Sequence, residues 1–226
     1  MGLFIRLKTK KFVFAPGCAL MLYKPDLAKK VHLMLNELFG EMDLHLTCCQ
    51  HEPNLEPGTV VINICPGCNK RFANDYPHIS TISLWEILAE VDSFPFPDYR
   101  GLSMSIIDAC PTREQEKIHD AIRILLKKMN INVVEPKNTR SKSTCCGDSF
   151  YGLIPVEEVK ELMVKRTSEM TENEVVVYCI SCVKAVYNGG KNSRYLVDLL
   201  FNEETLPRTL DLDKWHEEMN SFIEAH

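Results

Sequence analysis

The chain has 226 residues, a formal net charge of -5, 45% hydrophobic and 25% charged residues, values that are ordinary for a globular protein with one large or two small domains. The acidic balance argues against a nucleic-acid-binding role, because such proteins usually carry a basic surface. No apolar run approaches the roughly 18 residues that a membrane span needs.

The amino terminus, "MGLFIRLKTKKFVFAPG", does not predict a targeting segment. Lysines interrupt its apolar stretch, which is untypical of a signal peptide. Arg6 stands where a myristoylation motif needs Ser or Thr. We therefore expect a cytoplasmic protein without a membrane span.

Strands and helices are expected to alternate along the first half, residues 1–96. Strands are predicted at residues 10–18, 42–49 and 58–65, and helices at residues 24–40 and 82–91, with Gly40 ending the first helix. The chain between residues 50 and 59, "QHEPNLEPGT", reads as a loop punctuated by proline. A proline-rich stretch, "SFPFPDYRG" (residues 93–101), marks the boundary to the second half.

The second half, residues 97–202, follows the same order. Strands are predicted at residues 102–110, 131–136 and 173–182 and helices at residues 113–129 and 155–170, and residues 193–204 close the unit. Pro155 is tolerated at the start of its helix. Residues 203–226 are expected to form a helical tail. Strands that alternate with helices predict an α/β fold with two Rossmann-like βαβ half-domains, parallel sheets and pseudo-twofold symmetry between the halves.

The ten cysteines form an internal repeat. The order is one cysteine, a vicinal pair and a C-x-x-C motif, and it occurs twice with no cysteine left over. The first set is Cys18, Cys48, Cys49, Cys65 and Cys68, and the second set is Cys110, Cys145, Cys146, Cys179 and Cys182. Because each group follows a predicted strand, the loops at the carboxyl edge of a parallel sheet can bring five sulfurs together.

Five converging thiolates in a reducing compartment indicate a metal site rather than disulfides. Structural zinc needs four ligands in a closed tetrahedron, which leaves one cysteine over in each set. Adjacent cysteines chelate a single ion poorly, whereas they can reach different irons of one cluster. The spacing therefore favours iron–sulfur clusters over zinc, which stays as the alternative.

The doubled pattern resembles the cysteine-rich CCG domain family, represented by the catalytic B subunit of heterodisulfide reductase. The resemblance runs from Cys18 to about Phe201 and includes the "CCG" at residues 145–147. It implies an oxidoreductase that splits a small disulfide, with two [4Fe–4S] clusters held by all ten cysteines, noncubane at the second set. It also implies catalytic roles for Cys110, Cys145 and Cys146 and a cluster-binding role for Gly147.

The first motif departs from the family pattern. It reads "CCQH", with Gln50 in place of the glycine, and only 15 residues (50–64) separate it from the next cysteine, against 32 (147–178) in the second half. The first half therefore lacks one helix. Its site is expected to hold a cubane, a differently substituted cluster or none.

Partners follow from the same resemblance. The ferredoxin-like domain of larger relatives is not seen, so electrons would come from a partner subunit, a ferredoxin or a flavoprotein. An electron-transfer subunit of a hydroxyacid-oxidising complex, without substrate chemistry of its own, is the alternative redox function.

Four further residues are candidate neighbours of the site. Arg140 and Lys142 could attract an anionic thiol or belong to a solvated loop. His51 could donate to a sulfur, whereas His119 is expected at the surface. The stretch "YNGGKNS" (residues 187–193) is expected to be a loop and not a phosphate-binding motif.

Overall fold

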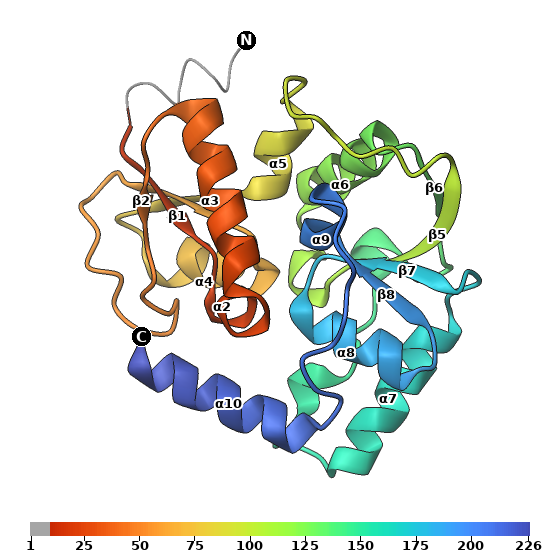
Figure 1. Ribbon diagram of the computed structural model, residues 1–226. Coiled ribbons are helices and arrows are strands. Elements are labelled where there is room, and N and C mark those ends of the chain that lie inside the picture. Colours follow the sequence, from red (N-terminus) through yellow and green to blue (C-terminus); the bar gives the residue numbers. More distant parts are fainter. Residues whose placement is uncertain (1–9) are drawn as a thin grey trace. The chain divides into compact units, whose positions relative to one another are not determined.

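The computed structural model describes residues 10–226 (Figure 1). The prediction on Arg6 lies outside the described residues. Within residues 10–226, no helix combines the length and the apolar character that crossing a membrane requires.

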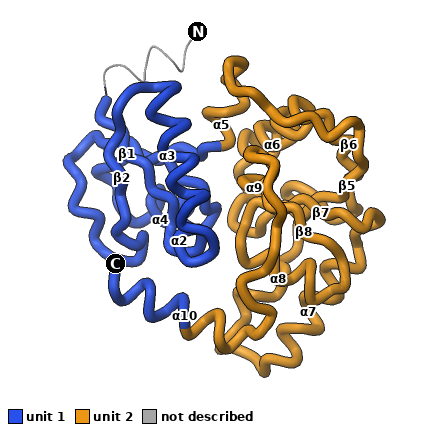
Figure 2. Tube along the Cα trace, viewed as in Figure 1, with its two compact units in different colours: residues 1–84, 218–226 blue, residues 85–217 orange. Residues whose placement is uncertain are grey.

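The chain divides into two compact units (Figure 2). One consists of residues 1–84 and 218–226, and the other of residues 85–217. The last helix, α10 (Leu212–Ala225), is divided between them. The boundary predicted at residues 96 and 97 and the separate tail at residues 203–226 remain predictions.

Each unit contains a four-stranded parallel sheet. In the first, the strands are β1 (Phe12–Ala15), β2 (Asp43–Leu44), β3 (Val60–Asn63) and β4 (Ser80–Ser83), in the order β2-β1-β3-β4. In the second, they are β5 (Leu102–Ile107), β6 (Ile131–Val134), β7 (Glu174–Val177) and β8 (Asn192–Tyr195), in the order β6-β5-β7-β8. The predicted α/β class with two Rossmann-like half-domains is confirmed, and the strand order repeats between the units.

The helices connect the strands. The first unit has α2 (Cys18–Tyr23), α3 (Pro25–Phe39) and α4 (Pro66–Asp75), and α5 (Leu84–Ala89) starts at its last residue. The second has α6 (Glu116–Lys128), α7 (Val156–Ser168), α8 (Ile180–Asn188), α9 (Leu196–Leu200) and the short 3-10 turns η1 (Cys110–Thr112), η2 (Arg140–Lys142) and η3 (Asp148–Phe150). Central strands β3 and β7 are β-branched and buried, as parallel sheets covered on both faces require.

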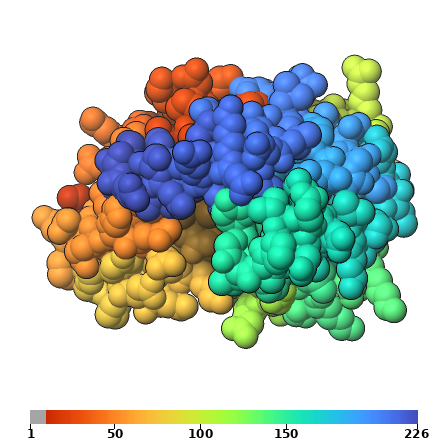
Figure 3. Space-filling model, turned by 90° about the horizontal axis from the view of Figure 1, so that it is seen from below, coloured from red at the N-terminus to blue at the C-terminus, as the bar shows by residue number. Residues whose placement is uncertain are grey.

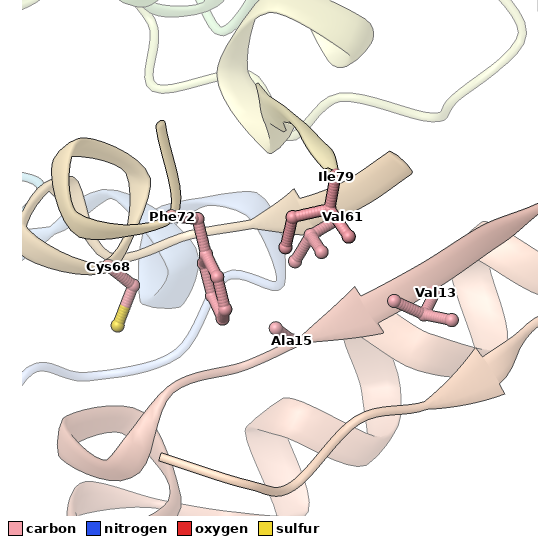
Figure 4. Packing of buried hydrophobic residues seen from close by; sticks show 6 residues of the cluster. All are labelled: Val13, Ala15, Val61, Cys68, Phe72 and Ile79. Atoms are coloured by element: carbon pink, nitrogen blue, oxygen red, sulfur yellow. The ribbon is translucent and has the colours of Figure 1, made fainter. Parts of the chain in front are cut away.

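A hydrophobic cluster supports the cysteine side of the first sheet (Figure 4). It contains Val13, Ala15, Val61, Phe72, Ile79 and Cys68. Cys68 is one of the predicted metal ligands. Cys49 and Cys65 pack against the same cluster from partly buried positions. The first cysteine set is therefore anchored in the core of its own unit.

Several predicted elements need correction. The C-x-x-C motifs begin helices α4 and α8, and Cys18 begins α2, none of which the sequence pattern indicated. The helix predicted at residues 82–91 is preceded by strand β4, and the loop predicted at residues 187–193 contains the end of α8 and the start of β8.

The predicted difference between the halves is confirmed. Residues 50–59 contain no helix, whereas the corresponding part of the second half contains α7. Pro155 lies at the N-cap of α7, and Gly40 ends α3 with a positive φ of 91°.

Candidate metal centres

The cysteines lie at the carboxyl ends of the strands in both units. In the first unit, Cys18 begins α2 after β1, and Cys65 is the N-cap of α4 after β3. In the second, Cys110 begins η1 after β5, and Cys179 is the N-cap of α8 after β7. All ten cysteines are free thiols.

The five sulfurs of the first set are joined by hydrogen bonds in the order Cys18, Cys48, Cys49, Cys68, Cys65. Cys48 is an acceptor, and hydrogen bonds from Cys18 and Cys49 lower its pKa to about 2. As a donor to Cys48, Cys49 has its pKa raised to about 12. A hydrogen bond from Cys68 lowers the pKa of Cys65 to about 7. The first set therefore forms one connected group of sulfurs.

The second set is joined in the same order: Cys110, Cys145, Cys146, Cys182, Cys179. Hydrogen bonds from Cys110 and Cys146 hold the pKa of Cys145 far below its usual value. The pKa of Cys146 is raised, chiefly by its hydrogen bond to Cys145 and despite one from Cys182. Cys145 is thus the counterpart of Cys48, and the linkage of sulfurs repeats with the sequence.

Backbone groups repeat as well. The N–H of Gly147 donates to the Cys145 sulfur at 3.3 Å, and the N–H of Gln50 donates to Cys48. The Ser149 hydroxyl adds a contact of 2.9 Å to Cys145. Any residue other than proline can donate its backbone N–H at this position, so Gln50 donates in the first set as Gly147 does in the second.

The donor atoms are of the type that an iron–sulfur cluster takes. Five soft sulfurs are connected in each unit, which is the ligand type that iron–sulfur clusters take. Gly17, at φ +79°, approaches the first set so closely that a Cβ there would meet the Cys68 sulfur at 3.2 Å. Across residues 10–226, however, no group of three or more His, Cys, Asp or Glu side chains is arranged to hold a metal ion, so the match to a cluster is one of donor type and not of geometry.

The backbone conformation and the neighbours of Gly147 require a glycine at this position. Its φ is +107°, and an added Cβ would meet the Val159 carbonyl oxygen at 2.9 Å and the Leu162 Cβ at 3.0 Å, both on α7. The first unit has no helix at this place, and Gln50 is absent from the described non-glycine residues with positive φ. The difference between "CCG" and "CCQ" therefore follows from α7.

We expect Gly147→Ala to lower the free energy of unfolding by about 2–4 kcal/mol, because backbone strain and overpacking against α7 add. The measurement is urea denaturation of the metal-free chain. Gln50→Ala, at the matched and exposed position, is the control and should stay within about 0.5 kcal/mol of wild type. Equal effects of the two substitutions would contradict this account of the glycine.

Asp108, which the sequence analysis missed, organises the second set. Its fully buried carboxylate receives two hydrogen bonds from Arg123, at 2.5 and 2.8 Å. The Thr139 hydroxyl and the Arg140 N–H also donate to it, at 3.0 and 2.7 Å. Tyr178 donates from the end of β7 at 3.1 Å. Burial alone would raise the pKa of Asp108, but these hydrogen bonds and the Arg123 charge lower it to about 2.

The position of Asp108 explains why these bonds matter. It lies two residues before Cys110, Tyr178 lies directly before Cys179, and residues 139 and 140 lead into the vicinal pair. One carboxylate thus joins the three cysteine-bearing segments of the second unit. The signal for Asp108 in the sequence was an aspartate directly after a buried strand, but a sequence alone does not show the partners of that side chain.

Arg166 supports the same loop from α7. It is 1% exposed and donates to the Ser143 hydroxyl at 3.0 Å and to the Asn138 carbonyl at 2.9 Å. The Ser143 hydroxyl donates in turn to the Asp108 carbonyl. The loop before Cys145 is therefore held from both sides.

The four candidate neighbours of the site differ in their surroundings. The prediction for His119 is wrong, because its side chain is 1% exposed and lies 3.0 Å from the Thr112 hydroxyl. The guanidinium of Arg140 pairs with Asp120 at 2.6 Å, and Lys142 is exposed. His51 is exposed, and its charge contributes to the low pKa of Cys48 after the stronger hydrogen bonds from Cys18 and Cys49.

Comparison with protein-family models, with curated proteins and with solved structures finds no match to this chain.

Proposed function

We propose that this protein is an iron–sulfur oxidoreductase of the CCG type that reduces a small disulfide in the cytoplasm. The observation that carries the proposal is the repeated set of five cysteines, which the loops after the parallel strands carry in the same order in each unit. A structural zinc site takes four ligands, so it gives no reason for the fifth cysteine in each set.

The partial exposure of three cysteines of the second set supports a role for this set in contacting substrate. Cys145, Cys110 and Cys179 are partly exposed, whereas Cys146 and Cys182 are buried. The buried sulfurs would fix the metal group to the unit, and the partly exposed ones border the side that a disulfide can reach. We therefore assign substrate reduction to the second set.

The reaction breaks one S–S bond, consumes two electrons and two protons, and releases two thiols. When bound, an iron–sulfur cluster at each set would supply one electron to this reduction. A ferredoxin, a flavoprotein or a partner subunit would provide both electrons. Solvent would provide the two protons. The chain's own residues hold the sulfurs, as Asp108 and Arg166 do in the second unit.

The test begins with iron, sulfide and zinc analysis of chain purified without oxygen. About eight irons and eight sulfides per chain are expected for two four-iron clusters. Zinc without iron or sulfide would overturn the proposal. The same preparation is then given an artificial one-electron reductant and small disulfides such as glutathione disulfide, and free thiol is measured.

Thiol release above a control with no protein supports the reductase. A chain with clusters that releases no thiol from any disulfide, but passes electrons to an acceptor dye, would be an electron carrier instead. That outcome would overturn the assignment of substrate chemistry to the second set.

A further inference from the structure

The repeat carries a charged pair at one set only. Two residues after each vicinal pair stand His51 and Asp148, and two residues after each C-x-x-C motif stand Lys70 and Lys184. The second unit therefore has a carboxylate and an ammonium at positions where the first has an imidazole and an ammonium. Only the second combination can form an ion pair of opposite charges at neutral pH.

The pair forms in the second unit and is buried. The Lys184 Nζ lies 2.9 Å from Asp148 Oδ1, with the two side chains 2% and 8% exposed. Lys70, on the equivalent helix of the first unit, is exposed. Lysine is rarely buried without a partner, so the pairing rather than the residue type accounts for the difference.

The first turns of α10 cover the pair. The Trp215 ring lies 4.6 Å from the Lys184 Nζ, and His216 Nε2 is 3.2 Å from Asp148 Oδ1. The Tyr151 ring stacks on His216 at 3.8 Å, and its hydroxyl donates to Asp213 at 2.6 Å. Figure 3 shows the start of this helix against the segment that follows the CCG loop.

The pair joins two ligand-bearing segments. Asp148 follows Gly147 in the loop of Cys146, whereas Lys184 lies on α8, which carries Cys182. Removing one partner of a buried salt bridge strongly destabilises the folded protein, because the other charge stays buried without compensation. Such a link between two segments does not require a metal ion to be present.

We propose that the Asp148–Lys184 ion pair holds the segments that carry Cys146 and Cys182 together before any metal is bound. The second set would then fill before the first and lose its metal more slowly. Lys184 and Asp148 are positioning residues that act through Cys146 and Cys182. The consequence for cluster filling rests on the proposed function, whereas the arrangement of the metal-free thiols does not.

The first test uses the metal-free full-length chain. Alkylation of each cysteine by iodoacetamide is followed by mass spectrometry in wild type, Lys184→Met and Lys70→Met. We expect Lys184→Met to speed alkylation of Cys146 and Cys182 by about tenfold and Lys70→Met to leave them unchanged. Unchanged alkylation of both thiols in Lys184→Met would overturn the proposal, whether or not the chain binds iron.

The second test follows filling with ferrous iron and sulfide under reducing conditions. Chains carrying Cys48→Ser or Cys145→Ser each retain one complete set, so the two sets are observed separately by their absorption and magnetic resonance spectra. We expect the second set to release iron to a chelator more slowly, and Lys184→Met to speed that release by about 10–100-fold, as for other groups that orient metal ligands. Equal release from both sets would overturn the order of filling.

A double variant separates positioning from folding. Asp148→Asn with Lys184→Met removes both buried charges, so it is expected to fold even if Lys184→Met alone does not. Rapid alkylation and iron loss at the second set in a double variant of wild-type stability would support positioning. Wild-type alkylation and retention there would overturn it. If wild type takes up no iron at all, the proposed function fails, but the alkylation test still decides the role of the pair.

Discussion

Replacing Cys145 by serine is expected to remove the second cluster and lower the iron and sulfide content from about eight to about four per chain. Cys145 is the second sulfur in the order of its set and accepts hydrogen bonds from Cys110, Cys146 and the Gly147 backbone. A serine oxygen is a harder and poorer ligand for such a cluster than a thiolate. Iron and sulfide analysis and magnetic resonance spectra of chain purified without oxygen provide the measurement.

Cys48→Ser is the matched variant, because Cys48 has the same place in the first set. It should remove the other cluster and leave the spectrum that Cys145→Ser loses. The two remaining spectra are expected to differ, since Gln50 and the short following loop distinguish the first set. Loss of both clusters in either variant would contradict two sets that fill independently.

Asp108→Ala is expected to lower the free energy of unfolding by about 3–5 kcal/mol and to reduce iron binding at the second set. The substitution leaves Arg123, which is 14% exposed, without its buried partner, and removal of one member of a buried pair costs about this amount. It also releases Tyr178 and the loop that leads to Cys145. Urea denaturation of the metal-free chain and iron analysis of the loaded chain measure the two effects.

Glu135→Ala is a sharp control, because Glu135 pairs with the same Arg123 at 2.8 Å but has a side chain that is 39% exposed. Exposed ion pairs contribute about 0–1 kcal/mol, so a small change is expected. If the two alanine variants were equally stable, the organising role of Asp108 would be refuted.

The positions of the central strands β3 and β7 along the chain could be predicted because the β-branched runs within Val60–Asn63 and Glu174–Val177 are continuous and buried. The edge strands β4 and β8, "STIS" and "NSRY", lack such runs, and their formation depends on pairing with a neighbour. Helices α4 and α8 begin inside the C-x-x-C motifs. They were not predicted because these segments were interpreted as metal-ligand motifs and not as helix starts.

The candidate site divides in the same way. Its ten cysteines and their grouping by strand could be read from the chain, because a repeat of ligand types does not need coordinates. The burial of His119 and the roles of Asp108 and Arg166 could not, since each depends on contacts between residues far apart in sequence.

The sequence by itself determined the two sets of five cysteines, the parallel α/β class and the missing helix of the first half. Only the tertiary structure decided that Gly147 is required by α7 and that Lys184 is buried while Lys70 is exposed. The physical reason is that ligand chemistry resides in the residue itself. Burial, steric limits and ion pairing arise from neighbours that folding brings together.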